Sequence, residues 1–161
     1  MRLSVLEKLE KELIESEREL KVDIPKALKI ATAMGDLSEN ADYKAAKERQ
    51  MFLESRVSLL QKRVADITSL NINRIPKDRS ALGSTLTLKE VESGESKIYK
   101  LVFPEEVDPD NGKISPGSPV GKALLGKQEG DQVTIAMPGN TTVYKVAKLI
   151  TIHEDSGQGP V

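Results

Sequence analysis

Two heptad patterns of apolar residues, one on each side of a short acidic segment, constrain the fold of the first half of the chain. Apolar residues at alternating spacings of three and four lie on one helical face and form the seam of a coiled coil. Before the segment, the seam positions are Leu6, Leu9, Leu13, Ser16, Leu20, Asp23, Ala27 and Ile30. After it, they are Tyr43, Ala46, Gln50, Leu53, Val57, Leu60, Val64 and Ile67.

The two seams predict an antiparallel helical hairpin. Leu6 pairs with Ile67 at the base, and each later layer steps inward by the same number of residues on both helices. The turn is therefore expected at Asp36 and Leu37. Because both seams converge on the same turn, two independent patterns favour one hairpin.

Charged residues beside the seams support this pairing. Arg49, Arg56 and Arg63 lie on one edge of the second helix. In the predicted register, Arg56 faces Glu19 and Arg63 faces Glu12. Opposite charges beside a coiled-coil seam favour one pairing of helices over others.

The first helix, expected over residues 3–33, contains one interruption. Pro25 has no backbone N–H group, and its ring clashes with the preceding turn. Since Asp23 is suited to cap a restarted helix, the sequence predicts a kink or break between Val22 and Pro25. Asp23 would also pair with Gln50, and a polar layer of this kind fixes register at some cost in stability.

The residues between the helices have the pattern of a helix end followed by a helix start. Gly35 suits the left-handed conformation that closes many helices. Asp36 and Glu39 have the spacing of a capping box, and the second helix is expected to continue from there to about Leu70.

Three carboxylates, those of Asp36, Glu39 and Asp42, lie close together in this segment. Helix capping explains them on composition alone, because acidic side chains accept hydrogen bonds from the free N–H groups of a first turn. Ionised carboxylates also bind hard cations. Mg²⁺ keeps several waters and accepts one or two protein carboxylates, with substrate phosphates completing its coordination. The turn is therefore also suited to be half of a metal site that a partner completes.

Composition excludes several classes of function. The chain has 161 residues, a formal net charge of -1 and no cysteine, which excludes disulfides and thiolate metal sites. No overall field attracts it to nucleic acid or to anionic membranes. The sequence contains neither an apolar run long enough to span a bilayer nor a signal peptide, so we expect a cytoplasmic protein that does not bind membranes.

The second half of the chain has the two-residue alternation of β-strands. Strands are predicted over residues 84–91, 97–103, 132–137 and 142–150. Ser118, Pro119 and Gly126 have the pattern of one short helix. The expected divisions are a hairpin over 1–73, a linker over 74–78, a β-domain over 79–155 and a flexible tail over 156–161. The fold class is α+β, with an N-terminal antiparallel α-helical coiled-coil hairpin followed by a small antiparallel β-sheet domain.

The segment from Gly35 to Tyr43, continued by Ala45 to Gln50, forms a specific sequence motif. It resembles the tip signature of the Gre transcript cleavage factors of bacterial RNA polymerase, which are transcription elongation factors. Residues 114–127 and 131–135 are similar to the C-terminal pattern of the same family. The resemblance therefore covers nearly the whole chain.

The resemblance implies a fold and a mechanism. Gre factors have a C-terminal domain similar in fold to FKBP, which docks at the rim of the polymerase secondary channel, while the coiled coil enters the channel. Two tip acids help to hold the second Mg²⁺ of the polymerase active site and orient a water. The polymerase then cleaves backtracked RNA by two-metal hydrolysis, which rescues arrested complexes. The chain is thus expected to be a monomer that stimulates RNA polymerase and is not itself an enzyme.

The resemblance also assigns site residues. Asp36 and Glu39 match the two tip acids, and they would be the catalytic residues and the Mg²⁺ ligands shared with the polymerase. Contacts with the backtracked RNA 3′ end or the channel would come from Asn40, Tyr43, Lys47 and Arg49, of which Asn40 and Tyr43 would alternatively shape the tip. For the basic residues the alternative is a solvated face with salt bridges inside the hairpin.

Thr32 stands where family members usually carry an arginine, so we expect weaker or differently tuned activity. It also leaves open a Gre-like inhibitor that blocks the channel without cleavage, although Asp36 and Glu39 at the ordinary spacing argue against it. A prolyl isomerase is disfavoured because the second domain has few aromatic residues, and a chaperone or scaffold would not need an acidic tip. His153, the one histidine, is expected at the surface.

Overall fold

The computed structural model describes residues 3–35 and 39–155. Asp36, one of the two expected tip acids, lies outside these ranges. The chain divides into two units, Leu6–Leu70 and a second unit formed by Asn71–Val161 with Met1–Val5. Within the described ranges, no helix is both long and apolar enough to cross a membrane.

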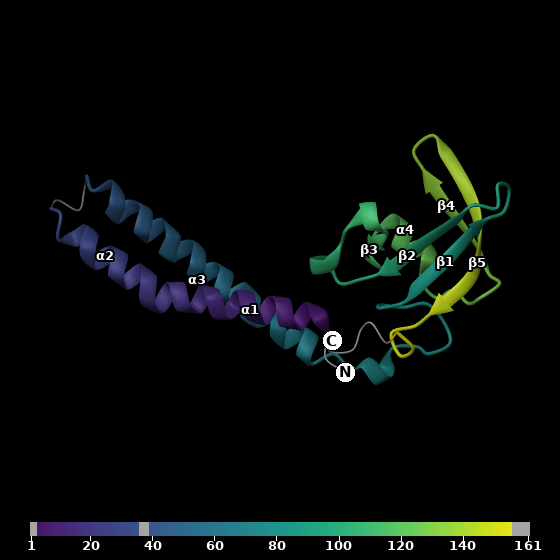
Figure 1. The fold of residues 1–161 in the computed structure, drawn as a ribbon, viewed down its shortest axis with the longest axis horizontal. Coiled ribbons are helices and arrows are strands. Elements are labelled where there is room, and N and C mark those ends of the chain that lie inside the picture. The colour runs from purple at the N-terminus through teal and green to yellow at the C-terminus, as the bar shows by residue number, and fades with distance from the viewer. Residues whose placement is uncertain (1–2, 36–38, 156–161) are drawn as a thin grey trace. The chain divides into compact units, whose positions relative to one another are not determined.

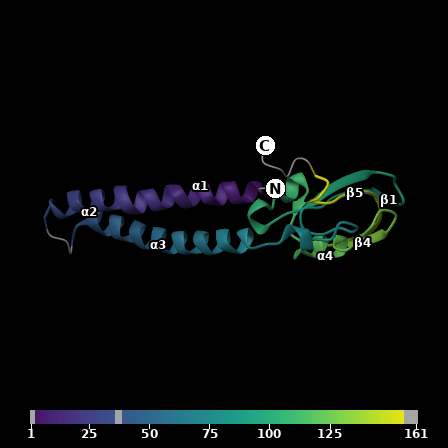
Figure 2. The ribbon, with the colours of Figure 1, turned by 90° about the horizontal axis from the view of Figure 1, so that it is seen from below.

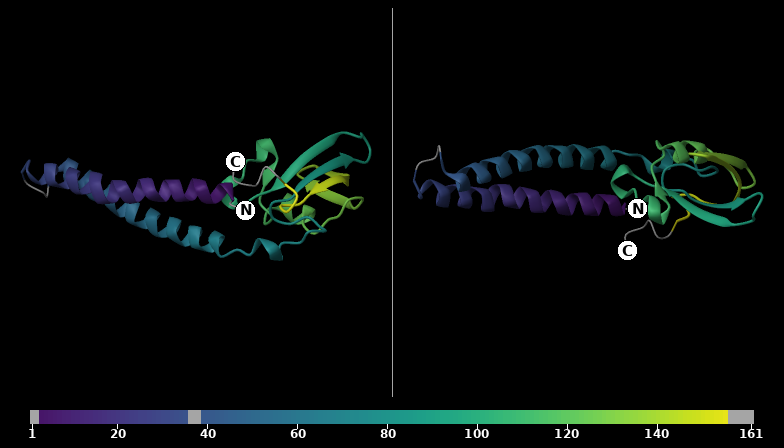
Figure 3. Two further views of the ribbon diagram at one scale, coloured as in Figure 1. Left: turned by 60° about the horizontal axis from the view of Figure 1, so that its bottom comes forward. Right: turned by 90° about the horizontal axis from the view of Figure 1, so that it is seen from above.

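The first unit is an antiparallel helical hairpin, which confirms the predicted architecture. One side consists of α1 (Ser4–Arg18), a π-helical turn η1 (Glu19–Asp23) and α2 (Ile24–Thr32). The other side is the long helix α3 (Ala41–Thr68). Figure 1 labels these elements, and Figures 2 and 3 show from other directions that α1 and α2 lie side by side with α3.

The seam of α3 lies where the heptads predict it. All of its predicted seam residues are buried or half-buried, and the exposed fractions of Leu53 and Leu60 are only 2% and 1%. The predicted seam positions of the first helix from Leu6 to Leu20 are also buried or half-buried. Since burying one large aliphatic side chain contributes about 1.5–3 kcal/mol, these rows supply much of the stability of the hairpin.

The predicted seam is wrong beyond Leu20. The residues of α2 that are least exposed come one position later than the heptads predict: Ile24, Leu28 and Ala31 in place of Asp23, Ala27 and Ile30. The π-helical turn explains this shift, because the N–H of Ile24 donates to the carbonyl of Glu19 and the turn takes up one extra residue. Asp23 is exposed, so the expected polar layer with Gln50 is not formed.

The predicted kink or break takes the form of a π turn, which interrupts the α-helix at Glu19–Asp23, and the helical backbone then continues past Pro25. Asp23 and Ile24 both keep right-handed helical backbone angles, and Asp23 makes no side-chain cap. In a regular α-helix the proline ring would meet the carbonyl of Lys21, which here lies within the wider π turn. The expected capping role of Asp23 is therefore wrong, because the π turn accommodates the proline and no helix restarts.

The second unit is built on a five-stranded sheet of order β3-β2-β1-β5-β4. The strands are β1 (Thr85–Glu90), β2 (Ser96–Leu101), β3 (Lys113–Ile114), β4 (Gln132–Met137) and β5 (Asn140–Ile150). Neighbouring strands are antiparallel except for β2 and β3, which pair in parallel. The expectation of a wholly antiparallel sheet is thus wrong at one edge, because β3 is too short to have an alternating pattern.

The predicted short helix is confirmed as α4 (Pro119–Leu124), which contacts β4. The hydroxyl of Ser118 caps it by accepting a hydrogen bond from the N–H of Gly121 at 3.0 Å. A Cβ atom on Gly121 would overlap the carbonyl oxygen of Ser115, so this position requires glycine. The core that α4 helps to cover consists of Leu86, Leu88, Leu101, Ile114, Leu124, Val133, Ile135, Tyr144 and Val146.

His153 is half-buried and does not have the free surface position that we expected from the sequence. Its Nε2 lies 2.7 Å from the carbonyl oxygen of Ile75. Because a carbonyl only accepts, Nε2 carries the proton and donates this bond. His153 thus attaches the segment around Ile75 to the end of the β-sheet unit.

Candidate functional site

Asn40 joins the two sides of the hairpin next to the turn. Its Oδ1 accepts a hydrogen bond from the N–H of Tyr43 at 3.0 Å, which makes it the N-cap of α3. Its Nδ2 donates to the carbonyl oxygen of Ala31, near the end of α2, at 2.7 Å. One side chain therefore satisfies a free N–H group at the start of α3 and adds a hydrogen bond to a carbonyl in the last turn of α2, which also accepts from the N–H of Met34 at 3.1 Å. This arrangement fixes the two ends of the turn relative to each other.

Helix α3 begins later than the capping-box pattern predicts. Its first residue is Ala41 and its cap is Asn40, so Glu39 precedes the cap. The predicted start of the helix at Asp36 and Glu39 is therefore wrong, because Asn40 provides the cap in their place. Glu39 is exposed. Its carboxylate is therefore open to solvent and lies outside the first turn of α3.

Two further predicted site residues lie on successive turns of α3. Tyr43 is half-buried in the first turn, and Lys47 is exposed one turn later. The Lys47 Nζ lies 6.0 Å from the centre of the Tyr43 ring and donates to Oε1 of Gln50 at 3.3 Å. Glu39, Asn40, Tyr43 and Lys47 therefore gather at the end of the hairpin. Their contacts with RNA or the channel stay predictions.

Arg49 is held in a two-point ion pair with Glu19. Its Nε and Nη2 donate to the two carboxylate oxygens at 2.7 and 2.9 Å. The hydrogen bond from Arg49 lowers the pKa of Glu19, and the same bond raises the pKa of Arg49. The guanidinium also lies 5.2 Å from the centre of the Phe52 ring. A contact of Arg49 with RNA stays a prediction, and it would compete with this pair.

The ion pairs differ by one heptad from those predicted. Arg49 pairs with Glu19, and Arg56 pairs with Glu12 at 2.7 Å, whereas the sequence analysis paired Arg56 with Glu19 and Arg63 with Glu12. Residues one heptad apart lie on the same edge of the helix, so heptads show which edge a partner lies on but not which of two successive partners is bound. Because long side chains can reach in either direction, the pattern does not select one partner.

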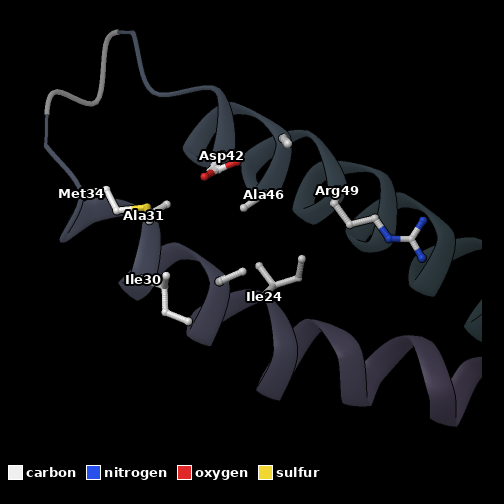
Figure 4. A pocket seen from close by; sticks show the side chains of 9 residues that line it. Ile24, Ile30, Ala31, Met34, Asp42, Ala46 and Arg49 are labelled. Atoms are coloured by element: carbon white, nitrogen blue, oxygen red, sulfur yellow. The ribbon is translucent and has the colours of Figure 1, made fainter.

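An apolar groove of about 460 Å³ lies between α2 and α3 beside the turn. In Figure 4, Asp42 and Ala46 point from α3 toward α2, where Ile24 and Ala31 lie. Sequence reasoning missed this groove because the expected seam filled the space between the helices with Ile30, whereas Ile30 is 53% exposed and only lines the groove. The small side chains of Ala31 and Ala46 are the sequence signal that the space exists.

Binding of Mg²⁺ by the carboxylates at the turn stays a prediction. Within residues 3–35 and 39–155, no three His, Cys, Asp or Glu side chains are grouped to hold a metal ion. Glu39 nevertheless presents an exposed carboxylate, and oxygen ligands of this kind suit Mg²⁺. With Asp36 three positions earlier in the sequence, the chain offers the one or two carboxylates that Mg²⁺ accepts when a partner supplies the other ligands.

A helical hairpin with carboxylates at its turn, followed by a small β-sheet domain, is the architecture of a class of transcription elongation factors. The family description "Transcription elongation factor, N-terminal" matches residues 3–68, and "Transcription elongation factor, GreA/GreB, C-term" matches residues 75–151. The chain therefore belongs to the GreA/GreB family of transcription elongation factors, and the resemblance read from its motifs is confirmed.

Two relatives of known family agree with the family assignment. Transcription elongation factor GreA of Thermodesulfovibrio yellowstonii is 42% identical, with 89% of this chain and 90% of the relative covered. Transcription elongation factor GreA of Bacillus licheniformis is 39% identical, with 88% and 90% covered. Among solved structures, GreA factor homolog 1 (Gfh1) of Thermus thermophilus is similar at 28% identity over 90% of this chain and 94% of that one, with a TM-score of 0.42.

Proposed function

We propose that this protein binds bacterial RNA polymerase in the cytoplasm and inserts its helical hairpin into the secondary channel. There it stimulates the polymerase's own Mg²⁺-dependent cleavage of backtracked nascent RNA, without being an enzyme itself. Membership of the GreA/GreB family supports a role in transcription elongation. One observation supports the finer proposal. Glu39, beside the turn, is exposed, and its carboxylate is not needed as a helix cap because Asn40 caps α3.

The hairpin delivers carboxylates to a distant active site. Helix α3 has 28 residues, and at about 1.5 Å per residue it spans about 40 Å. Asp36 and Glu39 would hold a Mg²⁺ ion together with the polymerase. When bound, this ion would activate a water and stabilise charge on the phosphate oxygens. The chain itself would only present and orient its two carboxylates. The two hydrogen bonds of Asn40, which join α2 and α3 beside the turn, support this role.

Neighbouring residues would bind the RNA end and the channel. Tyr43 and Lys47 lie on successive turns of α3 next to Glu39, so an aromatic ring and an ammonium group are available to the backtracked 3′ end. The β-sheet unit would dock at the rim of the channel. The protein would act as a monomer, because one hairpin fills one channel.

The test measures the rate of RNA shortening in halted, backtracked polymerase complexes that contain Mg²⁺. Asp36→Asn and Glu39→Gln each remove one proposed ligand, and we expect each to slow cleavage on the order of 10²-fold, as for other groups that stabilise charge in a transition state. Polymerase binding should change little. Glu54→Gln is the matched control, because it removes the same charge as Glu39→Gln from an exposed position of α3 away from the turn.

Two outcomes would overturn the proposal. Tip variants that cleave as fast as the wild-type chain would show that the carboxylates do not take part. Binding that slows elongation without any cleavage would instead establish a protein that blocks the channel.

A further inference from the structure

The π-helical turn Glu19–Asp23 changes which face of α2 meets α3. One residue corresponds to a rotation of about 100° around an α-helix. The heptads of α1, continued through an ordinary α-helix, would direct Ala27 and Ile30 toward α3. With the extra residue of the π turn, Ile24, Leu28 and Ala31 are the least exposed residues of α2, while Ala27 and Ile30 are exposed at the edge of the groove beside α3.

The π turn is held on both sides. At its start, Glu19 is bound to Arg49 of α3 by two hydrogen bonds at 2.7 and 2.9 Å. Directly after its end, Ile24 is 4% exposed and anchors the new face of α2. Pro25 follows, and its ring disfavours a regular α-helix through the preceding turn. The side chains of Glu19, Ile24 and Pro25 therefore together favour a π turn at this position of the helix.

The rotated face reaches the tip through Ala31. Its side chain is 1% exposed, and its carbonyl accepts the hydrogen bond from Nδ2 of Asn40 at 2.7 Å. A rotation of α2 by one residue would turn this carbonyl away from Asn40. The hydrogen bond between Asn40 and Ala31, which connects the two helices beside the turn, thus depends on the rotational phase of α2.

We propose that the π-helical turn is a positioning element that sets the rotational phase of α2 and thereby positions Asn40, the cap of α3 that follows the proposed catalytic Glu39. This inference rests on the proposed function. The turn itself touches neither RNA nor metal in this scheme. Its effect is transmitted by Ala31 and Asn40, so it acts on how the carboxylates are presented.

Two adjacent residues decide between the two phases. The observed phase buries Ile24 and exposes Asp23, whereas the regular α-helix would bury Asp23 and expose Ile24. Burying an unpaired carboxylate is costly, while burying isoleucine is favourable. The π turn therefore persists because it exchanges an unfavourable buried residue for a favourable one, and exchanging the two residues should remove it.

Three variants test the role of the π turn: a reference, one that should change the rotational phase of α2, and one that should remove the π turn but keep the phase. The reference is Pro25→Ala, which removes the ring that opposes a regular helix. On this background, Asp23→Ile with Ile24→Asp keeps the same composition but favours the regular α-helix in the rotated phase. Deletion of Val22, an exposed residue of the turn, also allows a regular α-helix but keeps Ile24, Leu28 and Ala31 on the face toward α3.

Single cysteines report the phase directly, because the chain has no cysteine of its own. Ile30→Cys and Ala31→Cys are introduced separately, and the rates of thiol labelling are compared. In the reference, position 30 should label faster than position 31, since the exposed fractions are 53% and 1%. The exchange variant should reverse this order, and the deletion variant should keep it.

Cleavage of backtracked RNA then tests the consequence. We expect the exchange variant to bind polymerase but to cleave on the order of 10²-fold more slowly, as small misplacements of reacting groups can cause. The deletion variant should cleave like the reference. The inference is overturned if the exchange variant keeps the labelling order, or if it reverses the order and still cleaves normally. Absence of cleavage by the reference and the wild-type chain would refute the proposed function, while labelling would still report the phase.

Discussion

Asn40 shows how one side chain determines the geometry of a turn. Aspartate, asparagine and serine are all favoured at helix N-caps, so the sequence of the turn offers several candidates for the cap of α3. The structure selects Asn40, whose amide uses two separate atoms, Oδ1 as an acceptor for the N–H of Tyr43 and Nδ2 as a donor to the carbonyl of Ala31. The cap position was not predictable from propensity, because the deciding partner lies on the other helix.

Substitutions at Asn40 should separate its two hydrogen bonds. Asn40→Ala removes both, and we expect a loss of about 1 kcal/mol for the cap and about 0.5–1.5 kcal/mol for the bond to Ala31. Asn40→Asp keeps the acceptor for Tyr43 but places a carboxylate against the Ala31 carbonyl. Amide hydrogen exchange at Tyr43 should therefore be faster in Asn40→Ala and nearly unchanged in Asn40→Asp. Equal acceleration in both variants would contradict the assigned cap.

At the scale of the element, the heptads predicted both helices of the hairpin but not the π turn. The sequence contains two overlapping rows that continue from Leu20, one through Asp23 and one through Ile24, and a strict heptad count selects the first. Burial energetics favour the second. Pro25 marked the correct place but suggested a break, because helix rules describe what proline removes and not how a wider turn accommodates it.

The ion pair between η1 and α3 gives this part of the hairpin a pH dependence. The Arg49 hydrogen bond lowers the pKa of Glu19 below its ordinary value of 4.5. A lowered pKa in the folded state contributes stability that is fully present above pH 4.5 and is lost as the pH falls through the lowered value. Glu19→Gln should therefore lower the melting temperature of the hairpin slightly at pH 7, and the difference from the wild-type chain should disappear in acid.

A matched variant tests whether this effect belongs to the pair. Glu15→Gln removes the same charge from an exposed position of α1. It should leave the melting temperature at pH 7 closer to that of the wild-type chain. Added salt should also reduce the effect of Glu19→Gln, because the side chains of Arg49 and Glu19 are 50% and 29% exposed. A difference that persists at low pH would mean that Glu19 acts through packing and not through its charge.

At the scale of the whole molecule, the chain has two separate cores. Residues of α1, α2 and α3 form the seam of the hairpin, while the core of the β-sheet unit consists only of residues from that unit. The change from heptads to two-residue alternation accounts for this division in physical terms, since each period buries its own face. The partner of the shortest strand, β3, was not predictable because two residues do not define a period.

Separate cores should make the two units lose stability separately. Leu60 is 1% exposed in the seam of α3, and Leu88 is fully buried in the sheet. Leu60→Ala should cost about 2–5 kcal/mol and speed amide hydrogen exchange in α3 while leaving β1 and β5 protected. Leu88→Ala should do the reverse at a similar cost. If either variant accelerated exchange equally in both units, the chain would unfold as one cooperative structure, and a mutation in the hairpin would then also weaken the β-sheet unit.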